Sequence, residues 1–147
     1  MNNVMTFLLE QAQDRETQAS LALSKARSEL EQYYQQLAQI EQYRLDYCQQ
    51  LVERGQQGLT ASQYGHLNRF LTQLDETLSK QKLAETHFQA QVTKCEQNWF
   101  EARKQRRSYE WLIEKKQKEA QKQQSIKEQK LMDEFATLRY SRTQSPF

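Results

Sequence analysis

Helix-breaking residues are confined to one short window and to the end of the chain. All three glycines lie between Gly55 and Gly65, and the only proline is Pro146. Most sheet folds need more turn residues than this, so the distribution predicts an all-α chain with one interruption. The 147 residues fit a single coiled-coil domain spanning 1–147. We expect a helix over about 4–54, a turn over about 55–66, a helix over about 67–140 and a frayed tail over about 141–147.

Apolar residues recur along both helical stretches at spacings of three and four, which is typical of the a and d positions of a coiled coil. We call each such row a seam. The first seam, which Val4, Leu8 and Ala12 continue loosely upstream, comprises Ala19, Ala22, Ala26, Leu30, Tyr33, Leu37, Ile40, Arg44, Tyr47 and Leu51. The second comprises Leu67, Leu71, Leu74, Leu78, Gln81, Glu85, Phe88, Val92, Cys95, Trp99, Ala102, Arg106, Tyr109 and Ile113.

A short connection between two seams predicts an antiparallel two-helix hairpin. Around a turn near residue 58, facing residues should have numbers that add up to about 117, so that Tyr47 lies by Phe70. The same register keeps Cys48 and Cys95 too far apart for a disulfide. The second helix extends beyond the first. Residues past about 113 therefore have no partner in the hairpin, and we expect them to dock elsewhere or to fray.

Local signals place the ends of the helices around the break. Gly55 is well placed as a left-handed cap of the first helix. Thr60 and Gln63 have the spacing of a capping box for the second helix. Gly65 weakens that interpretation, so the second helix should start between about 60 and 67.

Charge is unevenly distributed along the chain. The net charge is +2, but residues 101–130 hold ten Lys/Arg and five Asp/Glu, which gives this segment +5. Such a segment is either a solvated helix face or a docking strip for an acidic partner. The longest apolar run is Phe7-Leu8-Leu9, too short to span a bilayer, and the N-terminus lacks the pattern of a signal peptide. We therefore expect a cytoplasmic location and no membrane insertion.

No pattern of catalytic residues is present. The sequence lacks the phosphate-binding, dinucleotide-binding and zinc-protease motifs, and its two histidines and two cysteines are not clustered. A two-helix rod also offers no cleft in which paired carboxylates could have their pKa values shifted. We predict a protein that is not an enzyme and that has no catalytic residues, cofactor or metal.

Aromatic residues near the turn suggest a binding surface instead. Two rows at helical spacing adjoin across the predicted hairpin, and each includes positions beside the seam. They comprise Gln36, Ile40, Tyr43 and Tyr47 on the first helix, and Phe70, Leu74, Thr77 and Gln81 on the second. They form either a widened seam or a patch for a partner.

Several segments together resemble the FliJ family of bacterial flagellar type III export proteins. They are the Gln/Tyr-rich run over 32–43, the row from Phe70 to Gln81, Trp99 with the basic and aromatic helix after it, and Lys130-Leu-Met-Asp-Glu-Phe-Ala136 near the end. The resemblance covers nearly the whole chain. It implies a hairpin similar to the gamma-subunit stalk of rotary ATPases.

The resemblance also implies partners and sites. The chain would promote assembly and activity of a hexameric export ATPase, contact the cytoplasmic part of the export gate and escort export chaperones. It would be monomeric when free, and peripheral at the cytoplasmic face of the inner membrane. Gate contact is implied for the eight residues of the two aromatic rows. The stalk analogy would place Arg103, Arg106, Arg107 and Trp111 in the ATPase ring.

Three other interpretations stay open from the sequence. The chain could be the corresponding stalk of a virulence secretion system, although the Met-Asp-Glu-Phe-Ala segment favours the flagellar one. It could be a passive coiled-coil scaffold that dimerises. It could also bind nucleic acid through the basic helix, but interleaved glutamates such as Glu110 and Glu114 would repel phosphates, so we expect no nucleic-acid partner.

Overall fold

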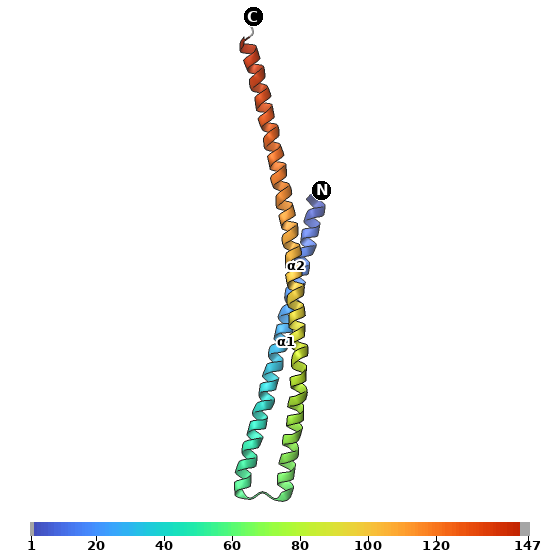
Figure 1. The fold of residues 1–147 in the computed structure, drawn as a ribbon, viewed down its shortest axis with the longest axis vertical. Coiled ribbons are helices and arrows are strands. Elements are labelled where there is room, and N and C mark those ends of the chain that lie inside the picture. The colour runs from blue at the N-terminus through green and yellow to red at the C-terminus, as the bar shows by residue number, and fades with distance from the viewer. Residues whose placement is uncertain (1, 145–147) are drawn as a thin grey trace. The chain divides into compact units, whose positions relative to one another are not determined.

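The computed structural model describes residues 2–144 and consists of two α-helices, as Figure 1 shows. Helix α1 spans Asn2–Gln57 and has 56 residues, and helix α2 spans Ala61–Gln144 and has 84. The all-α prediction is thus confirmed. The predicted tail is helical from residue 141 to Gln144, and its last three residues lie outside the described part. Within residues 2–144, neither helix has a stretch long and apolar enough to cross a membrane.

The connection between the helices is Gly58–Thr60, which is shorter than the predicted turn over 55–66. Gly58 has a φ of 91°, so it is the left-handed residue that ends α1, and Gly55 remains helical. The predicted cap at Gly55 was therefore wrong. The capping box is confirmed, because Gln63 N donates to Thr60 Oγ1 at 3.2 Å and Thr60 N donates to Gln63 Oε1 at 3.3 Å.

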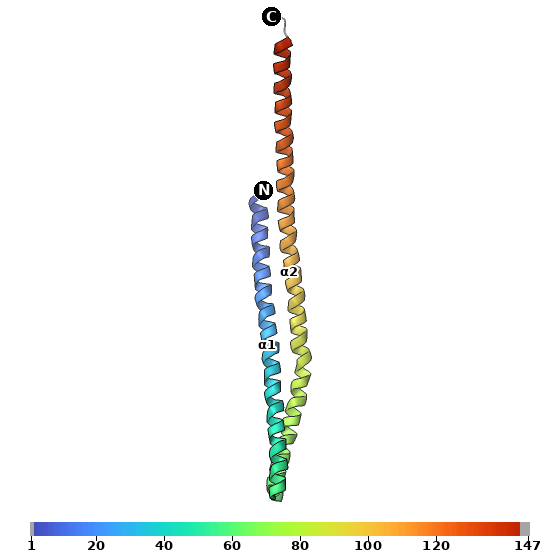
Figure 2. The ribbon, with the colours of Figure 1, turned by 90° about the vertical axis from the view of Figure 1, so that its left-hand side faces the viewer.

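The contacts divide the chain into two units, which we describe separately: the hairpin unit (residues 15–102) and the terminal unit (residues 1–14 and 103–147). In the hairpin unit, α1 and α2 run antiparallel and pack along their seams (Figures 1 and 2). Every predicted seam residue of α2 is buried or half-buried. Both cysteines are free, with Cys95 buried and Cys48 half-buried.

One predicted seam residue of α1 was wrong. Ala22 is exposed, whereas Leu23 is only 7% exposed and packs in a cluster with Ala26 and Cys95. A strict alternation of spacings places the seam residue before Leu30 at Ala26, four residues back, and the next at Leu23, three residues further back, so it does not include Ala22. The seam therefore keeps its period further upstream than the prediction allowed.

The predicted register holds at the turn. The rings of Tyr47 and Phe70 lie 4.3 Å apart between centroids. Further from the turn, Tyr33 stacks on Phe88 at 5.2 Å, a pair whose numbers add up to slightly more than 117. Tyr33 also reaches the Gln81 carbonyl, a pair whose numbers add up to slightly less than 117, so its two contacts lie on either side of the predicted register.

Polar residues interrupt the α2 seam at Gln81 and Glu85, and tyrosines of α1 meet them. The Tyr33 side chain is 3% exposed, and its hydroxyl donates to the backbone carbonyl of Gln81. The Tyr34 hydroxyl donates to Glu85 Oε1 at 3.0 Å and accepts from Gln89 Nε2 at 3.1 Å. These bonds satisfy polar groups that a purely apolar seam would leave without partners.

In the terminal unit, the first residues of α1 lie along α2. Ala12 is buried, Leu8 is half-buried, and the predicted seam residue Val4 is exposed. Met5 and Thr6 line a groove together with Ile113, Lys116, Gln117 and Ala120. Every described side chain from Glu114 to Thr143 is exposed. The predicted uncovered segment is therefore confirmed, although α1 reaches somewhat past residue 113.

The buried hydroxyl of Tyr33 allows a test of the polar contacts within the seam. Burial first, and then Glu85 and Tyr34, raises the pKa of this hydroxyl above its ordinary value of 10.0. Its contribution to stability should therefore be complete below about pH 10 and be lost as the pH rises through the folded-state pKa. We expect Tyr33→Phe to lower the melting temperature by roughly 2–5 °C at neutral pH and to weaken the alkaline loss of stability.

The matched control is Tyr43→Phe, because Tyr43 is 57% exposed. Thermal melts at about pH 7 and about pH 11 followed by circular dichroism would make the comparison. Equal behaviour of the two variants at both pH values would contradict a role for the Tyr33 hydroxyl.

Candidate functional site

The hairpin unit carries the first candidate surface, the aromatic surface, which consists of the eight residues of the two aromatic rows. Four of them are exposed: Gln36, Tyr43, Phe70 and Thr77. The other four are half-buried beside or within the seam: Ile40, Tyr47, Leu74 and Gln81. The structure therefore combines both alternatives that the sequence left open, a widened seam and an exposed apolar surface.

Contact across the hairpin joins the two rows. The Tyr47 and Phe70 rings meet at an interplanar angle of 43°, so each holds the other in place. The side chain of Tyr43 stands more freely beside them, because more than half of it is exposed. An exposed ring next to a fixed aromatic pair is the kind of group that anchors a protein partner.

Polar groups at the end of the aromatic surface away from the turn form hydrogen bonds within the chain. Thr77 Oγ1 donates to the Gln73 carbonyl at 2.9 Å, and the Gln81 carbonyl accepts from Tyr33. The exposed aromatic side chains are therefore better suited to bind a partner than these polar groups.

An ion pair that was not predicted from the sequence crosses the hairpin. Arg44 Nε lies 2.6 Å from Asp75 Oδ1, and this contact raises the pKa of the Arg44 guanidinium above its ordinary value. Both side chains line a groove with Leu45, Leu78 and Lys82. The predicted register could have found the pair, since the two residue numbers add up to nearly the expected sum. The pair explains how a charged residue occupies a seam position.

The second candidate surface lies on α2 in the terminal unit, where the structure separates the four predicted ATPase-binding residues. Arg106 is half-buried, and its Nη1 donates to both carboxylate oxygens of Glu110 at 2.9 and 3.0 Å. Arg103 is also half-buried. Arg107 and Trp111 are exposed, so these two are the most accessible to a partner.

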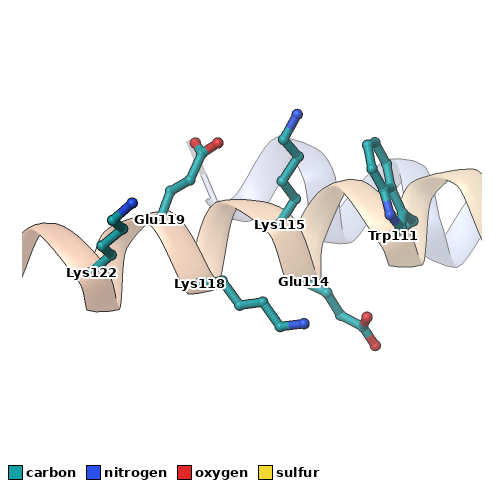
Figure 3. Close-up of a pocket in the computed structure, with 6 residues that line it drawn as sticks. All are labelled: Trp111, Glu114, Lys115, Lys118, Glu119 and Lys122. Atoms are coloured by element: carbon teal, nitrogen blue, oxygen red, sulfur yellow. The ribbon is translucent and has the colours of Figure 1, made fainter.

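Trp111 begins a shallow groove along the exposed side of α2, shown in Figure 3. The Lys115 ammonium lies 5.1 Å from the centre of its ring, within range of a cation–π contact. The remaining lining residues are Glu114, Lys118, Glu119 and Lys122. These lysines belong to the basic segment identified in the sequence; their common face was not predicted, although their spacing of three and four indicates it.

Among the described residues, no three His, Cys, Asp or Glu side chains are grouped so that they could hold a metal ion. The groove that begins at Trp111 is lined otherwise by exposed lysines and glutamates. Both surfaces have the composition of binding surfaces, one aromatic and the other basic.

Comparison with known proteins identifies the family. The family model described as Flagellar FliJ protein matches residues 1–145. No curated protein matches the chain. Among solved structures, a putative YscO homolog from Chlamydia trachomatis aligns with a TM-score of 0.50 and 17% identity, covering 99% of this chain and 94% of that chain. At that identity the likeness concerns the helical fold alone. The family match extends over nearly the whole sequence, and the chain therefore belongs to the FliJ family of flagellar proteins.

Proposed function

We propose that this chain is a stalk that joins the hexameric export ATPase to the export gate. Membership of the FliJ family makes it a component of flagellar type III protein export, and the family match over residues 1–145 is the observation that carries the proposal. The proposal places the chain in the cytoplasm, at the inner membrane through its contacts with the export apparatus. It also includes the escort of export chaperones.

A stalk of this kind acts through differential binding and needs no chemistry of its own. An asymmetric helix within a ring contacts the subunits unequally and so stabilises some of their conformations over others. The exposed Arg107 and Trp111 are suited to such contacts, because neither is held in the seam. The Arg106–Glu110 pair supports the helix and is not a direct contact in this proposal.

The aromatic surface is the proposed contact for the cytoplasmic part of the export gate. The aromatic residues Tyr43 and Phe70 would supply the binding energy, since large exposed rings dominate many protein interfaces. Tyr47 would act mainly by holding Phe70 in position. This division of roles distinguishes residues that touch the gate from residues that shape the surface.

Gate binding can be tested with two exposed side chains of α1. Tyr43→Ala should weaken binding to the purified cytoplasmic part of the gate protein by about tenfold or more, because it removes the exposed ring and leaves the seam intact. Leu45→Ala is the control, since Leu45 is also exposed but lies about 200° around the helix from Tyr43. Calorimetric titration would measure both. Equal effects of the two changes would contradict the assignment of the aromatic surface.

ATPase binding can be tested on α2 in the same manner. The double variant Arg107→Glu with Trp111→Ala should abolish most of the stimulation of ATP hydrolysis by the export ATPase, because it reverses one exposed charge and removes one exposed ring. The control is Lys127→Glu with Ile126→Ala, which makes equivalent changes at exposed positions further along the helix. Undiminished stimulation by the first variant, or equal losses in both, would count against the proposed site.

A further inference from the structure

The exposed side of α2 in the terminal unit carries a continuous basic row. We define the basic stripe as Lys104, Arg107, Trp111, Lys115, Lys118 and Lys122, which are all exposed and follow one another at three or four residues. At 100° per residue they share one face of the helix. The half-buried Arg106, Tyr109 and Ile113 mark the other face, where α1 packs. Figure 3 looks onto the stripe, with α1 behind α2.

Charge on this face is mainly positive. The stripe holds five cations and no carboxylate over about 27 Å of helix. Glu110 is engaged by Arg106, away from the stripe. Glu114 and Glu119 line the groove and point to opposite edges of the helix in Figure 3, Glu114 on the same side as Lys118 and Glu119 on the same side as Lys115. The positive potential is therefore highest along the middle of this face, and the two glutamates weaken it at the edges.

Trp111 adds an amphipathic ring to the centre of the row. Its side chain is 58% exposed, and Lys115 lies over the ring. An indole among lysines is typical of helices that lie at the boundary between lipid headgroups and water. A ring that served only to fill the seam would point towards α1.

We propose that the basic stripe docks the protein on a membrane surface rich in anionic lipid headgroups. A flat surface contacts one face of a helix, and this face of α2 carries the five cations of the stripe with carboxylates only at its edges. A pore that encloses the helix would also face Glu114 and Glu119. The contact is peripheral, because no described segment is apolar enough to insert. Binding through headgroup phosphates should be reversible and should weaken with salt.

This contact lies beyond the proposed stalk function and uses part of the same helix. Arg107 and Trp111 belong to both surfaces, so one molecule cannot present them to a bilayer and to an ATPase ring at the same time. Membrane docking would hold the protein close to the export apparatus while it is outside the ring. The two contacts can be measured separately, because ATPase stimulation needs no lipid.

The test uses the full-length protein and co-sedimentation with vesicles. Wild type should bind vesicles of phosphatidylglycerol and phosphatidylethanolamine, and high salt should abolish that binding. It should not bind vesicles of phosphatidylcholine. The triple variant K115Q/K118Q/K122Q should partition roughly 100-fold more weakly, because each cation near an anionic surface contributes about fivefold. The matched control K116Q/K127Q/K130Q removes the same charge from exposed positions off the stripe and should stay within about fivefold of wild type.

Each alternative outcome overturns the proposal. Absence of wild-type binding to the anionic vesicles would reject membrane docking. Equal losses of vesicle binding in the two triple variants would show that net charge alone causes adsorption, which would reject a role for the stripe. Tighter binding to single-stranded RNA than to the vesicles would make nucleic acid the partner. Glutamine retains a good helix propensity, so both triple variants should remain helical, which circular dichroism would verify. ATPase stimulation measured without lipid would report on the stalk function independently.

Discussion

The seam between the two helices is the constraint on which the other features depend. A two-helix coiled coil has only one narrow apolar contact, so each position at the three-four spacing matters. Few of the described side chains are buried, and the hairpin-unit cluster around Leu23, Ala26 and Cys95 illustrates how small this core is. Because the seam uses one face of each helix, the remaining faces are free to bind partners. The exposed residues of both candidate surfaces lie on such faces.

Polar residues in the seam are tolerated only where the opposite helix supplies a partner. Tyr33 meets the Gln81 carbonyl, and Arg44 meets Asp75. These contacts require one particular alignment of the helices, whereas leucines alone would accept several. The polar positions therefore restrict the register of the hairpin near the aromatic surface, and so they help to bring Tyr47 and Phe70 together.

The helices, the turn region and most of the seam could be predicted from the sequence, because glycine placement and a strict period are local signals. The prediction was wrong at two positions. Leu23 and not Ala22 occupies the seam, and Gly58 and not Gly55 has the left-handed conformation that ends α1. For the sites, the adjacency of Tyr47 and Phe70 followed from the register. The seam spacing also predicted the inward position of Arg106, whereas the stalk analogy counted it among the residues that bind the ATPase; its pairing with Glu110 along the helix was not predicted.

ATP hydrolysis by the purified export ATPase, with and without this protein, tests the stalk account most directly. Light scattering on the same samples would measure the fraction of ATPase in hexamers. The account predicts that hydrolysis and hexamer content rise together and saturate at one chain per hexamer, because a stalk occupies a single central position. No change in either quantity, with no co-purification of the two proteins, would contradict the stalk assignment.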